Sequence, residues 1–106
     1  MSGPRDYSLD EVKRGLAEDS ILLVDVREPH EFAAGHIPGA VNLPLSSFDP
    51  ASIAAKPGQE VVFSCRSGVR TLKAISASLE AGFPFEAHYP GSMLEWVQAG
   101  EEIETG

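Results

Sequence analysis

The sequence contains a single cysteine, Cys65, within the run Ser-Cys-Arg-Ser-Gly-Val-Arg at residues 64–70. A thiol reacts as its thiolate, and nearby arginine side chains or a helix N-terminus lower its pKa toward that form. Arg66 and Arg70 can also bind an anion through forked N–H donors, and Gly68 tolerates the positive φ of a tight loop. A lone cysteine is more often a buried apolar residue. This setting instead favours a nucleophilic cysteine in an anion-binding loop.

The elements on either side of the cysteine would position it at the edge of a sheet. Residues 60–64 form an apolar run, typical of a strand, that ends just before the cysteine. A helical pattern follows over residues 69–81, with Leu72, Ile75 and Leu79 on its expected apolar face. In open α/β sheets, ligands bind at the carboxyl ends of the strands. Backbone N–H groups of the loop and of the helix N-terminus would then surround the space above the sulfur.

The rest of the chain alternates between helical and strand patterns. Ser8 and Glu11 have the spacing of a capping box, which predicts the start of a helix over residues 9–17. The patterns predict further helices over 29–34 and 93–99, one helical turn within 46–54, and strands over 21–26, 41–43 and 85–89. Short connections between alternating strands and helices are typical of an α/β domain with a mostly parallel central sheet.

Composition limits the classes of function. The chain has 106 residues, which is the size of one domain, so we expect a single domain over residues 1–106. The net charge of −8 disfavours nucleic acid and anionic membrane surfaces as partners. No apolar run is long enough to cross a bilayer, and the N-terminus lacks the pattern of a secretory signal. One free cysteine without such a signal favours a reducing compartment, so we expect a cytoplasmic protein.

Two chemistries fit an activated cysteine in a loop of this size: phosphoryl transfer and sulfur transfer. Cysteine phosphatases resemble C-x5-R, whereas Cys65 and Arg70 are separated by four residues. The shorter loop has room for a terminal sulfur on the cysteine but less for a tetrahedral phosphate. A phosphatase also needs a general acid, and Asp49 is the nearest candidate only because it is an aspartate in a loop. Sulfur transfer is therefore favoured, and a phosphatase or arsenate reductase is the weaker alternative.

Three stretches of the chain resemble the rhodanese, or thiosulfate sulfurtransferase, family. Residues 23–28, 31–32 and 35–40 read LVDVRE, EF and GHIPGA and resemble its N-terminal signature. Residues 65–70 resemble its active-site loop, and residues 91–100 its C-terminal signature. The run Pro90-Gly91-Ser92 departs from the paired glycines that the family often has there, which affects the expected shape of that loop.

This resemblance implies a rhodanese-like three-layer fold with a five-stranded, mainly parallel sheet between helices. It implies a ping-pong reaction in which Cys65 takes a sulfur from thiosulfate or a similar donor, becomes a persulfide, and passes the sulfur to cyanide or a thiol. Mercaptopyruvate is the other donor that the loop resembles. The amides implied to cradle the sulfur and bind substrate belong to Arg66, Ser67, Gly68, Val69 and Arg70. Arg66 and Arg70 are implied to contact the substrate anion, and no metal or organic cofactor is implied.

A second interpretation is a binding module that accepts persulfide sulfur from a partner protein without turnover of thiosulfate. The small size of the chain motivates it, because no second domain is present in this sequence to shape a substrate site. A cysteine desulfurase would be the donor in that case, and the cysteine loop would accept the sulfur and pass it on within a sulfur relay.

Several other polar residues have a structural and a functional interpretation. Asp25 and Arg27 end a predicted strand near the active edge, where they could support the loop, although capping or bonding a turn is the more common role of such an Asp. Arg27 and Glu31 are four residues apart and could pair on a helix.

The histidines and the tryptophan favour structural roles. We expect His36 to bond the backbone, and His30 and His88 to lie at the surface; their spacing does not suggest a metal site. Trp96, with Met93 and Val97, fits the inner face of a helix.

Overall fold

The computed structural model describes residues 4–106, and its centre is a five-stranded sheet of order β1-β5-β4-β2-β3 in which every neighbouring pair is parallel. The strands are β1 (Arg5–Asp6), β2 (Ile21–Asp25), β3 (Val41–Asn42), β4 (Glu60–Ser64) and β5 (Ala87–His88), and the helices are α1 (Leu9–Glu18), α2 (Pro29–Ala34), α3 (Arg70–Glu80) and α4 (Ser92–Gln98), with short 3-10 turns η1 (Leu45–Ser47) and η2 (Pro50–Ser52). The predicted α/β fold with a five-stranded parallel sheet is confirmed. Residues 1–3 of the expected domain lie outside the described range.

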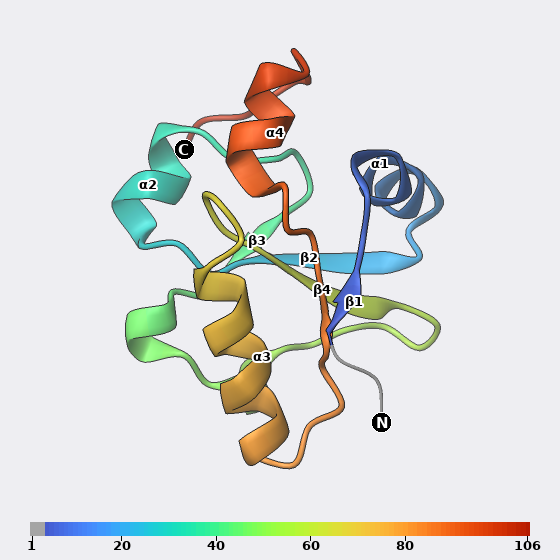
Figure 1. Cartoon of the computed structure of the whole chain (residues 1–106), viewed down its shortest axis with the longest axis vertical. Helices are drawn as coiled ribbons and strands as arrows, with labels where there is room; N and C mark the ends of the chain where they lie inside the picture. Colours follow the sequence, from blue (N-terminus) through green and yellow to red (C-terminus); the bar gives the residue numbers. More distant parts are fainter. Residues whose placement is uncertain (1–3) are drawn as a thin grey trace.

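The sheet separates two apolar cores, which gives the three layers that Figure 1 shows. Side chains alternate across a strand, so on β4 Val62 faces one core while Val61 and Phe63 face the other. The first core includes Val12 of α1 and Trp96 of α4, and the second includes residues of α3; each core also takes side chains from the central strands. Strands β2 and β4 are therefore covered on both faces, as their continuous apolar sequences require.

Most predicted elements appear within one or two residues of their expected ends. The capping box is present, with the Ser8 hydroxyl accepting from the Glu11 N–H and the Glu11 carboxylate accepting from the Ser8 N–H. Strand β5 has two residues rather than the five predicted, and β1 was not predicted at all. The longest helix, α3, has eleven residues, and within residues 4–106 no helix is long and apolar enough to span a membrane.

The predicted apolar face of α3 is wrong in part. Ile75 is buried, but Leu72 and Leu79 are each 46% exposed. The buried positions are instead Thr71, Ala74, Ile75 and Ser78, which share one face at helical spacing. Small side chains on that face let the helix axis lie close to β4 and β5, and the larger leucines are turned toward solvent.

The predicted burial of side chains on α4 and of the histidines is confirmed for some residues and wrong for others. Trp96 and Met93 are buried as expected, but Val97 is 55% exposed because it is one residue, about 100° of helical rotation, from Trp96. His30 is exposed, and the Nδ1 atom of His36 lies 2.9 Å from the Phe32 carbonyl oxygen, so both predictions are confirmed. The prediction for His88 is wrong: it is 4% exposed, because β1 and α3 cover it.

Candidate active site

Cys65 follows β4 directly, at the carboxyl edge of the sheet, and its side chain is buried. The chain then turns through residues 66–69 and enters α3 at Arg70. The start of α4 holds this loop in place, because the N–H groups of Met93 and Leu94 donate to the carbonyl oxygens of Cys65 and Arg66 at 3.1 and 3.0 Å. The loop is therefore fixed at both of its ends and along its backbone.

Backbone amides surround the sulfur. The Gly68 N–H donates to Cys65 Sγ at 3.1 Å. Burial raises the pKa of the Cys65 thiol, but hydrogen bonds, chiefly from the amides of Thr71, Gly68 and Ser67, outweigh it, so the pKa lies below its ordinary value. Hydrogen bonds to the charged form of an acid favour that form. Of the amides predicted to surround the sulfur, those of Ser67 and Gly68 favour the thiolate here, together with that of Thr71, which was not predicted.

Gly68 is the one position of this loop that a side chain cannot occupy. Its φ is +88°, a region in which L-residues are strained. A Cβ atom at Gly68 would also lie 2.5 Å from the carbonyl oxygen of Pro90. Close approach of the Pro90 backbone and a positive φ therefore both require glycine here, which is the conformational role expected from the sequence.

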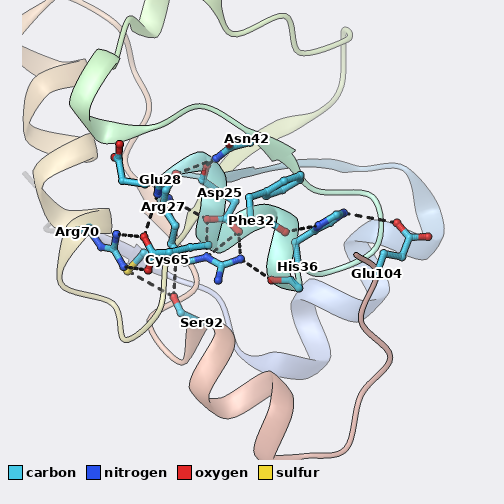
Figure 2. A network of polar contacts seen from close by, with 12 residues as sticks. Asp25, Arg27, Glu28, Phe32, His36, Asn42, Cys65, Arg70, Ser92 and Glu104 are labelled. Atoms are coloured by element: carbon cyan, nitrogen blue, oxygen red, sulfur yellow. Dashed lines mark hydrogen bonds and ion pairs between the residues drawn. The ribbon is translucent and has the colours of Figure 1, made fainter. Parts of the chain in front are cut away.

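Ser92 joins the site from α4, and the sequence reasoning did not identify it. Its hydroxyl oxygen accepts from the Cys65 N–H at 3.0 Å and lies 3.9 Å from Cys65 Sγ. Figure 2 shows Ser92 at the start of its helix, facing Cys65. The hydroxyl donates to the Tyr89 carbonyl at 2.7 Å. Ser92 also has φ of +50°, a region of the backbone map that glycine adopts most readily. The departure of Pro90-Gly91-Ser92 from the paired glycines that the resemblance implied was the signal that could have identified it.

Arg70 and Arg66 have different surroundings. The Arg70 guanidinium donates two hydrogen bonds to the Glu31 carboxylate, at 2.7 and 3.0 Å. The expected Arg27–Glu31 pair is therefore wrong. Hydrogen bonding to Arg70 lowers the pKa of Glu31 to about 2, and the same bond raises that of Arg70. Arg66 is exposed and takes part in no ion pair among residues 4–106.

Asp25 and Arg27 form a buried ion pair at the end of β2 (Figure 2). Arg27 donates to the Asp25 carboxylate through its backbone N–H, at 3.0 Å, and through its guanidinium, the shortest contact being 2.7 Å. A further guanidinium N–H donates to the Gly35 carbonyl at 2.8 Å. The pair thus closes the turn between β2 and α2. Within the described part of the chain, neither side chain forms a hydrogen bond to the cysteine loop.

A groove of about 370 Å³ lies beside the loop, between α2 and α4. Its lining residues are Arg27, Glu31, Ala34, Arg66, Met93, Leu94, Val97 and Gln98. Arg66 is the residue of the cysteine loop that lines this groove. The arrangement combines a thiol whose pKa is lowered, amide donors and an exposed guanidinium, which suits attack on an anionic electrophile.

A family model and several known proteins match most of the chain. Residues 8–99 match the model of the rhodanese-like domain. The thiosulfate:glutathione sulfurtransferase of Saccharomyces cerevisiae is 34% identical over 94% of this chain and 83% of its own, and that of Homo sapiens is 36% identical over 92% and 97%.

Solved structures agree with the sequence comparison. The human single-domain sulfurtransferase TSTD1 superposes with a TM-score of 0.72 at 35% identity, covering 92% of this chain and 97% of the human one. An uncharacterized protein from Saccharomyces cerevisiae gives a TM-score of 0.78 at 32% identity, covering 93% and 95%. The expected resemblance is confirmed, and the chain belongs to the rhodanese-like domain family.

Proposed function

We propose that the protein is a thiosulfate sulfurtransferase that works through a persulfide on Cys65. The thiolate attacks the outer sulfur of thiosulfate, the sulfur–sulfur bond of the donor breaks, and sulfite leaves with the bonding electron pair. An acceptor thiolate then attacks the outer sulfur of the persulfide, and the Cys65 thiolate returns. The observation that carries this proposal is the buried Cys65 sulfur with the Gly68 N–H donating to it at 3.1 Å.

The loop residues have separate roles in this proposal. The amides of Arg66, Ser67, Gly68, Val69 and Arg70 hold the outer sulfur of the persulfide, which carries negative charge. The exposed guanidinium of Arg66 binds the sulfonate group of the donor, because its donors are not occupied by a carboxylate in the described structure. Arg70 is held by Glu31, so it contributes positive electrostatic potential at the sulfur and does not bind the donor directly.

Asp25 and Arg27 support the loop indirectly in this proposal. Their ion pair fixes the turn from which α2 begins, and α2 carries Glu31, which holds Arg70. A change at the buried pair would therefore reach the loop through α2 and the Glu31–Arg70 contact.

A small thiol is the acceptor that the comparisons favour, with cyanide as the assay acceptor. Two relatives carry the name thiosulfate:glutathione sulfurtransferase, and the groove beside Arg66 has room for part of a tripeptide. We place the reaction in a reducing compartment such as the cytoplasm, where a free thiol and a thiol acceptor persist.

Mass spectrometry tests the intermediate directly. Incubation with thiosulfate should add about 32 Da, one sulfur atom, to the protein, and dithiothreitol should remove it. Cys65→Ser should not gain this mass, and Arg66→Met should need more thiosulfate for half-saturation. Steady-state rates with thiosulfate and glutathione should give the parallel double-reciprocal lines of a ping-pong reaction. A wild-type protein that turns over without the adduct, or an adduct retained in Cys65→Ser, would refute the mechanism.

A sulfur relay between proteins is the second candidate, and exposed apolar side chains near the loop favour it. Val69 is 62% exposed within the loop, and Leu94 is 41% exposed at the adjoining start of α4. Such a surface suits contact with another protein. Persulfide gain from a cysteine desulfurase, with negligible turnover of thiosulfate, would favour the relay. Turnover of thiosulfate with glutathione would favour the enzyme.

A further inference from the structure

A chain of hydrogen bonds runs from the sheet edge to the cysteine loop through the buried His88. The imidazole Nε2 atom lies 3.1 Å from the Asp6 carboxylate on β1. Its Nδ1 atom lies 2.7 Å from the Thr71 hydroxyl on α3. His88 is thus held between an edge strand and the first turn of the helix that follows the loop. It is distinct from the groups that surround the Cys65 sulfur.

Thr71 connects this histidine to the loop. Its side chain is fully buried, and its hydroxyl donates to the Gly68 carbonyl oxygen at 2.8 Å. A trans peptide is planar, so the direction of the Gly68 carbonyl also sets that of the Val69 N–H, on the opposite side of the same peptide group. The Val69 N–H is one of the amides that the proposed function places around the outer sulfur.

Counting protons shows that this chain depends on the charge of His88. Three hydrogen bonds lie in series, and the two ends, the Gly68 carbonyl and the ionised Asp6 carboxylate, only accept. The Thr71 hydroxyl supplies one proton, so the other two must come from His88, which has two N–H groups only as the imidazolium.

Neutral His88 leaves one link without a proton. If Nε2 keeps its proton for Asp6, the single Thr71 proton must serve either Nδ1 or the Gly68 carbonyl. If Nδ1 keeps the proton, Nε2 and the Asp6 carboxylate face each other as two acceptors. When the remaining proton stays on Nε2, which the stronger hydrogen bond to an ionised carboxylate favours, the Gly68 carbonyl competes with Nδ1 for the same Thr71 hydroxyl.

We propose that His88 and Thr71 are positioning residues, and that protonation of His88 anchors the Gly68–Val69 peptide of the cysteine loop through the Thr71 hydroxyl. Among residues 4–106, Asp6 is the ionisable side chain that pairs with the imidazole. The buried face of α3 presents uncharged side chains, and so do Val62 and Phe63 of β4, which pair with β5. The Cys65 thiol, the next ionisable group along the chain of contacts, lies beyond Gly68.

Nuclear magnetic resonance tests the coupling without any catalytic reaction. The experiment follows the His88 imidazole and the Gly68 and Val69 amides against pH in a Cys65→Ser background, where no thiol titrates. The Val69 amide should change its chemical shift together with the His88 imidazole signals as the pH is varied. In Thr71→Val the imidazole should still titrate but the amide should no longer follow, and Thr71→Ser should restore the coupling. A Val69 amide that ignores His88 in the parent would overturn the proposal.

Kinetics test the consequence, which rests on the proposed persulfide reaction. The Asn side chain can place its N–H₂ near the Nδ1 position and does not titrate, so His88→Asn should keep the anchor at every pH. The rate of persulfide formation in the wild type, plotted against pH, should differ from the curve for titration of one thiol by about 3- to 10-fold, which is the effect of one neutral hydrogen bond. The rate in His88→Asn should follow the curve for the thiol alone. His30→Gln, at an exposed imidazole of α2, is the matched control and should retain the wild-type profile.

The two arms separate the two proposals. Identical pH profiles for wild type and His88→Asn would overturn the positioning role. Absence of any persulfide together with a coupled Val69 amide would overturn the proposed function and leave the coupling established.

Discussion

Replacing Gly68 by alanine should damage both stability and the thiol, and each effect can be worked out from the structure. At a φ of +88° an alanine costs about 1 to 2 kcal/mol. Its Cβ would lie 2.5 Å from the Pro90 carbonyl oxygen, against 3.4 Å for ordinary contact. Backbone on one side or the other must move, which adds about 1 to 3 kcal/mol by analogy with overpacking. We therefore expect unfolding free energy to fall by about 2 to 5 kcal/mol.

The same movement would weaken the hydrogen bond from the residue 68 amide to the sulfur. A hydrogen bond to a charged group contributes about 1.5 to 3 kcal/mol, so its loss should raise the pKa of the Cys65 thiol. Alkylation by iodoacetamide, which consumes the thiolate, should then be roughly 10- to 100-fold slower at neutral pH.

Gly82 offers a matched control for this prediction. Its φ is +89°, but no atom lies within 4 Å of the Cβ that alanine would add. Gly82→Ala should therefore show only the conformational cost, about 1 to 2 kcal/mol, with an unchanged alkylation profile. Urea unfolding and alkylation rates against pH measure both quantities. Equal destabilisation of the two variants, or a Cys65 profile unaltered in Gly68→Ala, would refute the reasoning.

Three further predictions concern ion pairs and packing. Glu31→Gln should cost about 1 to 2 kcal/mol at neutral pH after allowance for solvent screening. Since the folded pKa of Glu31, about 2, lies below its ordinary 4.5, the pair with Arg70 contributes fully above pH 4.5. Its contribution is lost as pH falls toward 2, so a cost independent of pH in urea unfolding would contradict this assignment. Asp25→Asn should cost about 3 to 5 kcal/mol, because it leaves a buried guanidinium without its carboxylate partner; a thermally stable variant would exclude that role. Ile75→Ala should cost about 2 to 5 kcal/mol and Leu72→Ala much less, and the reverse order in denaturant unfolding would show that the other face of α3 is buried.

The parts of the site that lie close together in the sequence were predictable. A strand, Cys65 and a helix follow one another within a short stretch, and the chemistry of each residue type restricts what such a loop can do. The capping box of Ser8 and Glu11 is predictable for the same reason, since both partners belong to one helix turn.

Contacts between distant segments were not predictable from local patterns. Glu31 reaches Arg70 across 39 residues, and Ser92 reaches Cys65 across 27. Strand β1 has two polar residues and no hydrophobic pattern, and it pairs because β5 presents a free edge. The buried position of His88 follows from that pairing, so the error on His88 and the missing strand have one cause.

The burial of α3 illustrates a different limit. Leu72, Ile75 and Leu79 have helical spacing, but so do Thr71, Ala74, Ile75 and Ser78. Hydrophobicity favours the first set, whereas the structure buries the second. Small side chains permit close helix–sheet packing, and the Thr71 hydroxyl finds partners there, which a count of apolar residues does not register.

The two-residue strand β1 has a consequence for how the molecule folds and opens. Asp6 and His88 are 82 residues apart, and closing a loop of that length is entropically costly until the central strands have formed. We expect β1 to dock last during refolding and to fray first in native-state hydrogen exchange, with its amides exchanging well before those of β2 and β4. The described strands should therefore assemble in an order different from their order along the chain, because β1 precedes β2 to β5 in the sequence but pairs last.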